Sequence, residues 1–165
     1  MKSIYLVGFM GSGKTSIAEC LHKALGWGLQ DTDQMIVDYY QMSIPTIFEQ
    51  KGEAVFRKYE ANMLHNTTAE NTIVATGGGI IENEENRQWL INQGNIIFLQ
   101  TSWEEIERRL QHDSSRPIWN NQSRDKQKLL EDRTPKYLEV ASHVIQTDNK
   151  TEEMIASEII SNIHA

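Results

Sequence analysis

The chain has 165 residues and a formal net charge of −7, from 23 acidic and 16 basic side chains. This length predicts a single domain over residues 1–165 with a substantial core, and the acidic balance argues against a nucleic-acid partner because phosphate polyanions would be repelled. No apolar run reaches the roughly 18 residues of a membrane span, and because the first predicted strand begins almost at once we expect no signal peptide. Cys20 is the only cysteine and is expected to be a small buried hydrophobe, so we expect a reduced, cytoplasmic protein.

Short apolar runs alternate with helical patterns along the chain. Runs typical of β-strands lie at residues 4–7, 27–30, 72–76, 95–100 and 143–147. Helical patterns lie at residues 16–25, 34–64 with a break near Pro45, 86–93, from Thr101 or Ser102 onward, 125–140, and from about Ile155 to Ile163. Strands separated by helices predict an α/β fold of three layers, in which helices cover both faces of a five-stranded parallel sheet. Residues 111–124 are polar and lack periodicity, which predicts a mobile loop.

The first strand leads into Gly8-Phe9-Met10-Gly11-Ser12-Gly13-Lys14-Thr15, which matches the phosphate-loop pattern G-x-x-x-x-G-K-[ST] at every fixed position. The glycines let successive backbone N–H groups turn toward phosphate oxygens, and the helix that begins near Lys14 directs its positive end at the same anion. We expect Lys14 to neutralise the β- and γ-phosphates and the Thr15 hydroxyl to ligate Mg²⁺. This stretch predicts binding of a nucleoside triphosphate.

Asp31, Asp33 and Gly77-Gly78-Gly79 each follow a predicted strand, as the phosphate loop does. Because ligands of parallel sheets bind beyond the carboxyl ends of the strands, we expect these residues to meet at one edge. If the chain stays extended there, both aspartates point the same way. One would then support Mg²⁺ through water, and the other would accept a proton from an acceptor hydroxyl. For Asp33 the alternative is a helix N-cap, and for the glycines it is a flexible turn.

Two arginines downstream are candidates for binding a substrate carboxylate. The guanidinium of Arg57 would form a bidentate clamp, with Glu60 three residues later holding it in place. A surface Arg57–Glu60 ion pair is the alternative. Arg133, within Arg133-Thr134-Pro135-Lys136-Tyr137, is either a second clamp or a surface charge on a helix.

Arg109 and Arg116 flank the start of the aperiodic loop, in a zone from Arg108 to Lys136 that holds half of the basic residues. A mobile loop with arginines beside a triphosphate site is typical of a lid that closes over the phosphates, excludes water and stabilises the transferring group. The alternatives are a disordered surface loop and a solvated helix with alternating charges. None of the five histidines has metal-ligand spacing to another.

Taken in this order, the motifs make the sequence resemble the shikimate kinases over nearly its whole length. They are the phosphate loop Gly8 to Thr15, Asp31-Thr32-Asp33, Phe56-Arg57 with Glu60, Gly77-Gly78-Gly79, Arg116-Pro117, and Arg133 with Pro135 and Tyr137. The resemblance implies the phosphate-loop fold of nucleoside-monophosphate kinases, with strand order 2-3-1-4-5 and a mobile lid. It also implies transfer of the γ-phosphoryl group of ATP to the 3-hydroxyl of shikimate, on the pathway to chorismate and the aromatic amino acids.

The resemblance assigns roles to individual residues. The catalytic residues that it implies are Lys14, Asp33 as the base, and Arg116. The ATP-binding residues are Gly11, Ser12, Gly13, Lys14, Thr15, Ser16, Arg109 and Arg116, with Asp148-Asn149-Lys150 beside the adenine. The shikimate-binding residues are Asp33, Arg57, Gly78, Gly79 and Arg133, the first two within a helical segment at 33–61. Mg²⁺ would be held by Thr15 and, through water, by Asp31, and the family is mostly monomeric.

A few positions depart from the family pattern. Ile118 and Trp119 stand where two leucines are common, Thr134 where an asparagine is frequent, and Lys150 beside the expected adenine. None of these positions belongs to the residues assigned to the transferring phosphoryl group. The bulkier Trp119 would alter the packing or the closing rate of the lid.

Three alternative functions differ from this one in identifiable residues. A kinase of another small carboxylated polyol, such as gluconate, or of a nucleoside monophosphate would differ in the acceptor pocket. A GTP-dependent switch would need Asn-Lys-x-Asp, which Asn149-Lys150-Thr151-Glu152 approaches without matching. A catalytically inactive homologue with a regulatory role is opposed by Lys14, Asp33 and Arg116.

Overall fold

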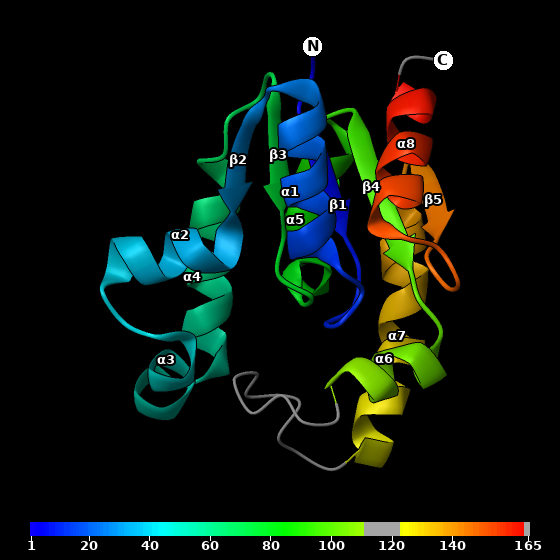
Figure 1. Ribbon diagram of the computed structural model, residues 1–165. Helices are drawn as coiled ribbons and strands as arrows, with labels where there is room; N and C mark the ends of the chain where they lie inside the picture. The colour runs from blue at the N-terminus through cyan, green and yellow to red at the C-terminus, as the bar shows by residue number, and fades with distance from the viewer. Residues whose placement is uncertain (111–122, 164–165) are drawn as a thin grey trace.

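The computed structural model describes residues 1–110 and 123–163, and it contains a five-stranded sheet whose neighbouring strands all run parallel (Figure 1). The strands are β1 (Ile4–Val7), β2 (Gly28–Asp31), β3 (Thr72–Ala75), β4 (Asn95–Gln100) and β5 (His143–Gln146). Their order across the sheet is β2-β3-β1-β4-β5. Both the predicted α/β fold and the strand order implied by the resemblance are confirmed.

Helices cover both faces of the sheet, which makes three layers (Figure 1). They are α1 (Lys14–Leu25), α2 (Thr32–Tyr40), α3 (Ile44–Lys51), α4 (Glu53–His65), the 3-10 helix η1 (Ile80–Glu82), α5 (Glu84–Ile91), α6 (Trp103–Leu110), α7 (Ser123–Val140) and α8 (Glu152–Ile163). Helices α1 and α8 pack on one face, and α4, α5 and α7 pack on the other. Helix α7 begins at Ser123, two residues before the predicted start at Asp125. In the described ranges, no helix combines the length and the apolar character that crossing a membrane requires.

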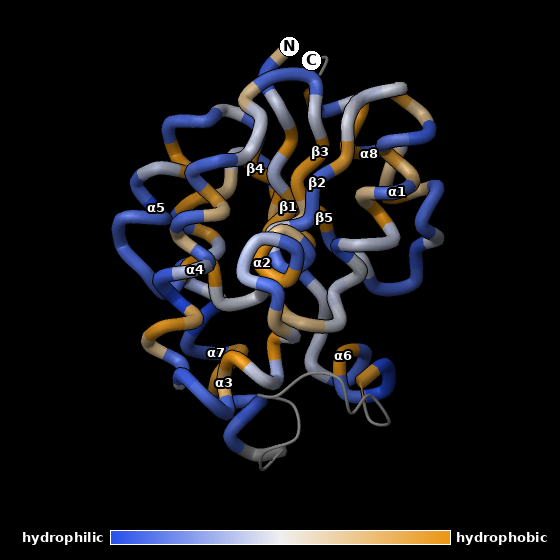
Figure 2. The backbone as a smooth tube through the Cα atoms, turned by 90° about the vertical axis from the view of Figure 1, so that its left-hand side faces the viewer, coloured by the Kyte–Doolittle hydropathy of each residue, from blue (hydrophilic) through white to orange (hydrophobic). Residues whose placement is uncertain are grey.

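The composition of β1 explains its central place between β3 and β4. Its four residues are fully buried: Ile4 and Leu6 face α1 and α8, whereas Tyr5 and Val7 face α4, α5 and α7. Because successive strand residues point to opposite faces, a strand that is covered on both faces is apolar throughout. Figure 2 shows the hydrophobic central strands inside helices and loops that are largely hydrophilic outside.

Residues 34–64, predicted as one broken helical segment, form the helices α2, α3 and α4. Pro45 lies in the first turn of α3, where its missing N–H costs no helical hydrogen bond. Gly52 ends α3 and precedes α4 with a φ of 88°, in the region that favours glycine. A separate small core holds these helices together and consists of Ile36, Ile47, Phe56 and Met63.

The carboxyl ends of β1, β2 and β3 meet at the end of the sheet that lies away from the two chain termini (Figure 1). The phosphate loop follows β1, α2 begins directly after β2, and the triple glycine follows β3. Parallel pairing of these three strands therefore gathers the chemically interesting segments in one place.

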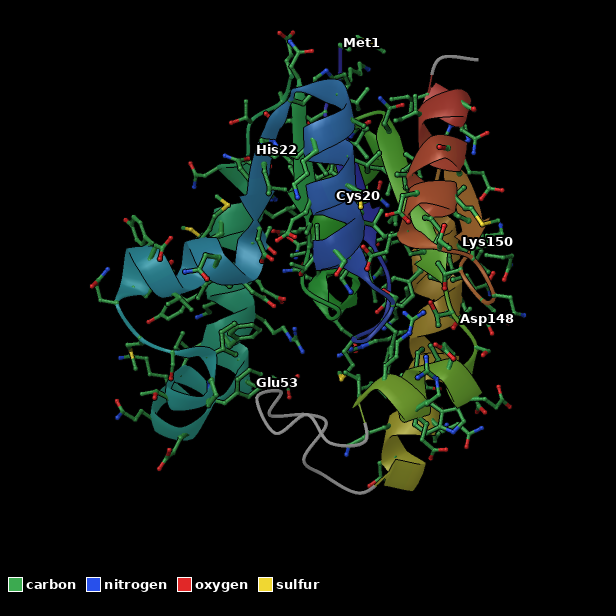
Figure 3. All side chains as sticks on the ribbon, viewed as in Figure 1. Met1, Cys20, His22, Glu53, Asp148 and Lys150 are labelled. Carbon is green, nitrogen blue, oxygen red and sulfur yellow. The ribbon has the colours of Figure 1, made fainter. Side chains whose placement is uncertain are left out.

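Cys20, predicted to be buried, is only half-buried. Its Sγ lies 3.7 Å from Oε2 of Glu152, at the seam between α1 and α8 (Figure 3). Partial burial and the neighbouring Glu152 carboxylate raise the pKa of the thiol. The prediction was wrong because Cys20 packs at the margin of the core between α1 and α8, where its side chain is only partly covered.

Candidate active site

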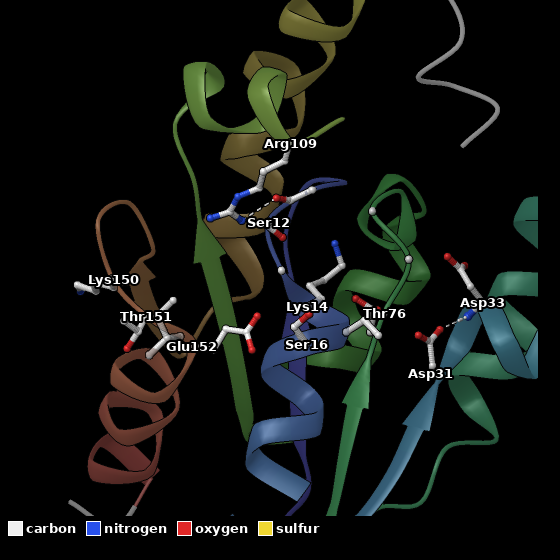
Figure 4. A pocket seen from close by; sticks show the side chains of 16 residues that line it. Ser12, Lys14, Ser16, Asp31, Asp33, Thr76, Arg109, Lys150, Thr151 and Glu152 are labelled. Carbon is white, nitrogen blue, oxygen red and sulfur yellow. Dashed lines mark hydrogen bonds between the residues drawn. The ribbon is translucent and has the colours of Figure 1, made fainter. Parts of the chain in front are cut away.

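A cavity of about 520 Å³ opens at the carboxyl edge of the sheet (Figure 4). Its lining comes from residues 11–16 of the phosphate loop, Asp31 and Asp33, residues 76–78 after β3, and Arg109 with residues 150–152 and Ile155. In Figure 4, Lys14 stands between the aspartate pair on one side and the start of α8 on the other. The predicted phosphate loop, aspartate pair and first two glycines therefore share one cavity.

The phosphate loop has the backbone that an anion site needs. Gly11 and Gly13 have φ values of 83° and 94°, which side chains disfavour, and α1 starts directly after Gly13 without a side-chain cap. The first N–H groups of α1 are thus directed at the loop. Lys14 is buried, and its Nζ donates to the carbonyls of Gly8 at 2.6 Å and Phe9 at 3.0 Å. These bonds hold the ammonium group inside the loop.

The neighbouring hydroxyls differ in their surroundings. Thr15 and Ser16 are exposed to the cavity at the start of α1. The hydroxyl of Ser12 is buried and has no hydrogen-bond partner among residues 1–110 and 123–163. A hydroxyl, an ammonium group and free helical N–H groups are the donors that phosphate oxygens require.

Asp31, not Asp33, is the cap of α2. Its Oδ1 accepts hydrogen bonds from the backbone N–H groups of Asp33 at 2.9 Å and Gln34 at 3.3 Å. The helix begins at Thr32, so the chain between the two aspartates is not extended, and the condition under which both would point the same way is not met. Both carboxylates nevertheless line the cavity (Figure 4). Because Asp31 supplies the cap, the side chain of Asp33 is directed instead toward Gly77, where Oδ1 lies 2.8 Å from the place a Cβ would occupy.

Arg57 and Glu60 form the predicted pair, but the pair is not a surface one. Nη1 of Arg57 lies 2.8 Å from Oε1 of Glu60, whose side chain is 1% exposed, and Nη2 lies 3.1 Å from Glu53. Burial by itself would lower the pKa of Arg57, but the two glutamates raise it above its ordinary value. The guanidinium reaches the backbone of Gly79, where a Cβ would overlap it.

Glu60 has a strongly raised pKa. Burial raises its pKa to about 7, against the opposing attraction of Arg57, and the like charge of Asp33 acts in the same direction as burial. Its Oε2 lies 2.7 Å from the Cβ position of Gly77, beside Asp33. Two carboxyl groups therefore meet over one glycine that has no side chain to separate them.

Arg133 is buried, 1% exposed, and so is not a surface charge of α7. Its Nε donates to Oε2 of Glu82 at 3.1 Å, and its guanidinium lies 5.8 Å from the ring centre of Phe9. Its Nη1 lies 3.7 Å from the Cβ position of Gly78 and has no hydrogen-bond partner in the described part of the chain. A buried guanidinium N–H without a partner is available to a ligand.

Tyr137, one turn after Arg133, fixes the middle glycine. Its hydroxyl donates to the carbonyl of Gly78 at 2.5 Å, and its ring stacks on Phe98 with centres 5.0 Å apart. Burial raises the pKa of Tyr137 well above its usual range, so the hydroxyl keeps its proton. On the other side of the same loop, the N–H of Gly77 donates to the Thr32 hydroxyl at 3.1 Å.

Arg109 closes the other side of the cavity. Its Nη1 donates to the carbonyl of Gly11 at 2.9 Å, and its Nε donates to Glu105 at 2.9 Å. Hydrogen bonds from Arg108 and Arg109 lower the pKa of Glu105 to about 2. Arg116, Trp119 and most of the predicted lid lie outside the described residues.

Comparison with known proteins decides the family. A family model described as shikimate kinase matches residues 10–164. A shikimate kinase of Bacillus cereus (strain AH187) is 40% identical over 164 residues, which are 99% of each chain. The chain belongs to the shikimate kinase family. A further shikimate kinase, of Histophilus somni (strain 2336), is 38% identical over 98% of this chain and 95% of its own.

Solved structures agree with this assignment. A shikimate kinase from Acinetobacter baumannii in complex with shikimate has a TM-score of 0.94 and 35% identity, over 99% of this chain and 93% of that one. A gluconokinase from Sinorhizobium meliloti 1021 has a TM-score of 0.67 at 18% identity, over 99% and 91%, which is likeness of fold alone. Shikimate kinase membership confirms the predicted enzyme class and goes against the gluconate and switch alternatives.

Sequence reasoning about this shikimate kinase site missed Glu82 and the role of Thr32. In the sequence motif Thr32 is only the middle residue of Asp31-Thr32-Asp33, whereas in the structure its hydroxyl accepts a hydrogen bond from Gly77, 45 residues away. Glu82 pairs with Arg133 and Lys136, which are 51 and 54 residues away. No local pattern reports such pairings, because they depend on how η1 and α7 pack.

Proposed function

We propose that this shikimate kinase transfers the γ-phosphoryl group of ATP to the 3-hydroxyl of shikimate, with Asp33 receiving the hydroxyl proton. One observation carries the proposal: Asp33 lines the same cavity as Lys14, while the guanidinium groups of Arg57 and Arg133 reach neighbouring glycines of one loop. A triphosphate site, a carboxylate and two cationic forks thus adjoin one another. These are the groups that a small acid with a reactive hydroxyl requires.

In the proposed reaction, the shikimate oxygen attacks the γ-phosphorus while its proton passes to the Asp33 carboxylate. The bond from the γ-phosphorus to the β–γ bridging oxygen breaks, and ADP leaves. Lys14 and the backbone N–H groups of residues 11–16 neutralise charge on the phosphates, and Arg109 contributes from the opposite wall. Arg116 lies outside the described residues, and its role at the transferring phosphoryl group remains a prediction.

The acceptor would be held by its carboxylate. Arg57 and Arg133 offer planar forks of N–H donors that match a carboxylate. Gly78 and Gly79 let those forks and the ligand approach the backbone without side-chain obstruction. Support comes from the buried Nη1 of Arg133, which is directed at Gly78 and has no partner among the residues described.

Mg²⁺ fits the donors at the other end of the site. Thr15 and Asp31 line the cavity and offer hard oxygen atoms. Among residues 1–110 and 123–163, no cluster of His, Cys, Asp or Glu side chains would hold a metal by itself. Mg²⁺ commonly uses one or two protein oxygens together with phosphates and water, so Thr15 would ligate it and Asp31 would hold one of its waters. When bound, the ion supplies positive charge to the phosphates.

An acceptor panel with a coupled assay for ADP tests the proposal. We expect ADP formation that requires both shikimate and Mg²⁺, and that stops when EDTA removes the metal. Gluconate and buffer alone serve as the matched controls. Equal ADP formation without an acceptor, or faster turnover with gluconate, would contradict the proposed reaction.

We also propose that residues 1–165 form one kinase domain, with shikimate bound through the helical segment at 33–61, and that the chain works as a cytoplasmic monomer without nucleic-acid or membrane partners. The acidic balance and the single half-buried cysteine support this. Light scattering coupled to size exclusion measures the mass in solution, and a mass twice that of the chain would contradict the monomer. The lid at 111–124 remains a prediction.

A further inference from the structure

Glu82 lies three residues after the triple glycine and binds two cations of α7. It is the last residue of η1, which starts directly after Gly79. The carboxylate binds two cations of α7: Oε2 accepts from Nε of Arg133 at 3.1 Å, and Oε1 accepts from Nζ of Lys136 at 2.7 Å. The main chain is held as well, because Arg87 donates to the carbonyls of Ile81 at 2.6 Å and Glu82 at 3.3 Å. Both the backbone and the side chain of Glu82 are thus fixed.

Fixing Glu82 also fixes Arg133. An arginine side chain has many rotamers, and ordering it costs conformational entropy. The bond from Nε to Glu82 and the face of Phe9 at 5.8 Å define the plane of this guanidinium. Its remaining edge then points to Gly78, with Nη1 at 3.7 Å from the Cβ position. A guanidinium that uses its Nε side for a carboxylate presents its other N–H groups in a set direction.

We propose that Glu82 is a positioning residue for the acceptor: it holds Arg133 in the orientation that binds the carboxylate of shikimate, and Lys136 offsets its charge. The inference rests on the proposed role of Arg133 as a carboxylate clamp.

The charges of this trio suit an anionic acceptor. Glu82 alone would repel a carboxylate bound nearby, whereas Glu82 with Arg133 and Lys136 carries one net positive charge. Burial would raise the pKa of Glu82, but the hydrogen bonds from Lys136 and Arg133 outweigh burial and lower it. Glu82 is therefore ionised at neutral pH, where its carboxylate accepts the hydrogen bond from Arg133.

A double-mutant cycle tests the inference, with KM for shikimate, KM for ATP and kcat measured for each enzyme. Glu82→Gln keeps the shape of the side chain and removes its charge. We expect it to raise KM for shikimate about tenfold, because a displaced binding group loses much of its effect, with kcat and KM for ATP within about twofold of the wild type. When Arg133 is already replaced by Gln, the further change Glu82→Gln should raise KM for shikimate by less than about twofold, because the effects of residues that act as one unit are not additive.

Asp132→Asn is the matched control. Asp132 precedes Arg133 on α7 and is exposed, and its carboxylate pairs with Lys128 at 3.4 Å. This variant removes the same charge from the same neighbourhood without touching Arg133, so its KM for shikimate should equal that of the wild type. Thermal unfolding of every variant checks the fold. If Glu82→Gln does not fold, Glu82→Asp replaces it, because the shorter carboxylate draws Arg133 away from Gly78 while retaining the charge.

The outcomes separate the inference from the proposed function. If Arg133→Gln leaves KM for shikimate unchanged, the carboxylate clamp fails, and the inference fails with it. If Arg133→Gln raises KM but Glu82→Gln behaves like Asp132→Asn, the clamp stands and the inference is overturned. It is also overturned if Glu82→Gln raises both KM values alike, or if the two substitutions multiply in the double variant, because either result indicates only a structural tie between η1 and α7.

Discussion

Oε2 of Glu60 and Oδ1 of Asp33 converge on Gly77, at 2.7 Å and 2.8 Å from the position that its Cβ would occupy. The other oxygen of Glu60 is bound to Arg57. Two carboxyl groups that share so small a space resist carrying two negative charges, and the pKa of the more buried group rises. Burial and Asp33 together raise the pKa of Glu60 to about 7, although Arg57 and Arg133 oppose them.

Glu60 should make the stability of the protein fall as the pH rises toward neutrality. Its pKa of about 7 in the folded protein exceeds the ordinary 4.5, so the folded state binds more protons than the unfolded state between these values. The stabilising contribution is complete below about pH 4.5 and is lost as the pH rises through 7. Glu60→Gln, which resembles the protonated form, should lack this loss.

Urea unfolding at several pH values from 5 to 8 measures this effect for the wild type and for Glu60→Gln. We expect the free energy of unfolding of the wild type to fall relative to the variant by an amount on the order of 2 kcal/mol across this range. Other groups titrate in both proteins and cancel in the difference. Parallel curves for the two proteins would show that Glu60 keeps an ordinary pKa.

Asp33→Asn should remove the proton acceptor while preserving the shape of the site. We expect kcat to fall about 10²- to 10⁴-fold, the usual contribution of a general base, with KM for ATP nearly unchanged because the phosphate loop is intact. Asp38→Asn is the control, since Asp38 is an exposed acid of the same helix that binds Gln34. A kcat within a few-fold of the wild type would limit Asp33 to orienting the hydroxyl.

Gly79→Ala should weaken shikimate binding through Arg57. The φ of Gly79 is −94°, which alanine adopts without strain, so the effect comes from the added methyl group alone. That methyl overlaps the guanidinium of Arg57 and forces it away. We expect KM for shikimate to rise about tenfold and the free energy of unfolding to fall by about 1–3 kcal/mol.

Gly28→Ala provides the comparison for this variant. The methyl would lie 3.3 Å from the Thr72 hydroxyl, away from the cavity, and the φ of Gly28 is also outside the left-handed region. Its KM for shikimate should match that of the wild type. If Gly79→Ala also leaves KM unchanged while Arg57→Ala raises it, Arg57 binds shikimate from a position that the methyl does not disturb.

The parts of the site that the sequence predicted are those whose pattern is local. The phosphate loop is a continuous sequence motif. The five strands could be predicted because each is a short apolar run that lies between helical patterns. The cap of α2 was predicted less well: Asp33 was the candidate from the sequence, whereas Asp31 is the cap in the structure. The choice depends on the residue at which β2 ends, which the sequence pattern does not define. Strand order followed from the resemblance alone, since the pairing of distant strands leaves no trace in periodicity.

The remaining features depend on packing between distant segments. The sequence left Arg133 open between a clamp and a surface charge, because only the packing of α7 against η1 and Phe9 buries it. The Arg57–Glu60 spacing predicted an ion pair but not its burial. In each case the residue type was evident, whereas the surroundings that give it a function come from the tertiary structure.

Tyr137→Phe should separate the hydrogen bond to Gly78 from the packing of the ring. The ring is buried against Phe98 and is retained in the variant, whereas the hydroxyl that donates to the Gly78 carbonyl at 2.5 Å is lost. We expect the free energy of unfolding to fall by about 1–2 kcal/mol, the usual cost of leaving a buried acceptor without its donor. KM for shikimate should rise a few-fold, because Gly78, which lies beside Arg133, is no longer held by this hydrogen bond. Burial keeps the pKa of Tyr137 high, so the loss of unfolding free energy should be the same from pH 6 to 9.

Tyr39→Phe, at a ring that is 70% exposed, is the control and should change neither the free energy of unfolding nor KM for shikimate. A Tyr137→Phe enzyme with unchanged stability and unchanged KM would show that Gly78 is fixed by its backbone alone.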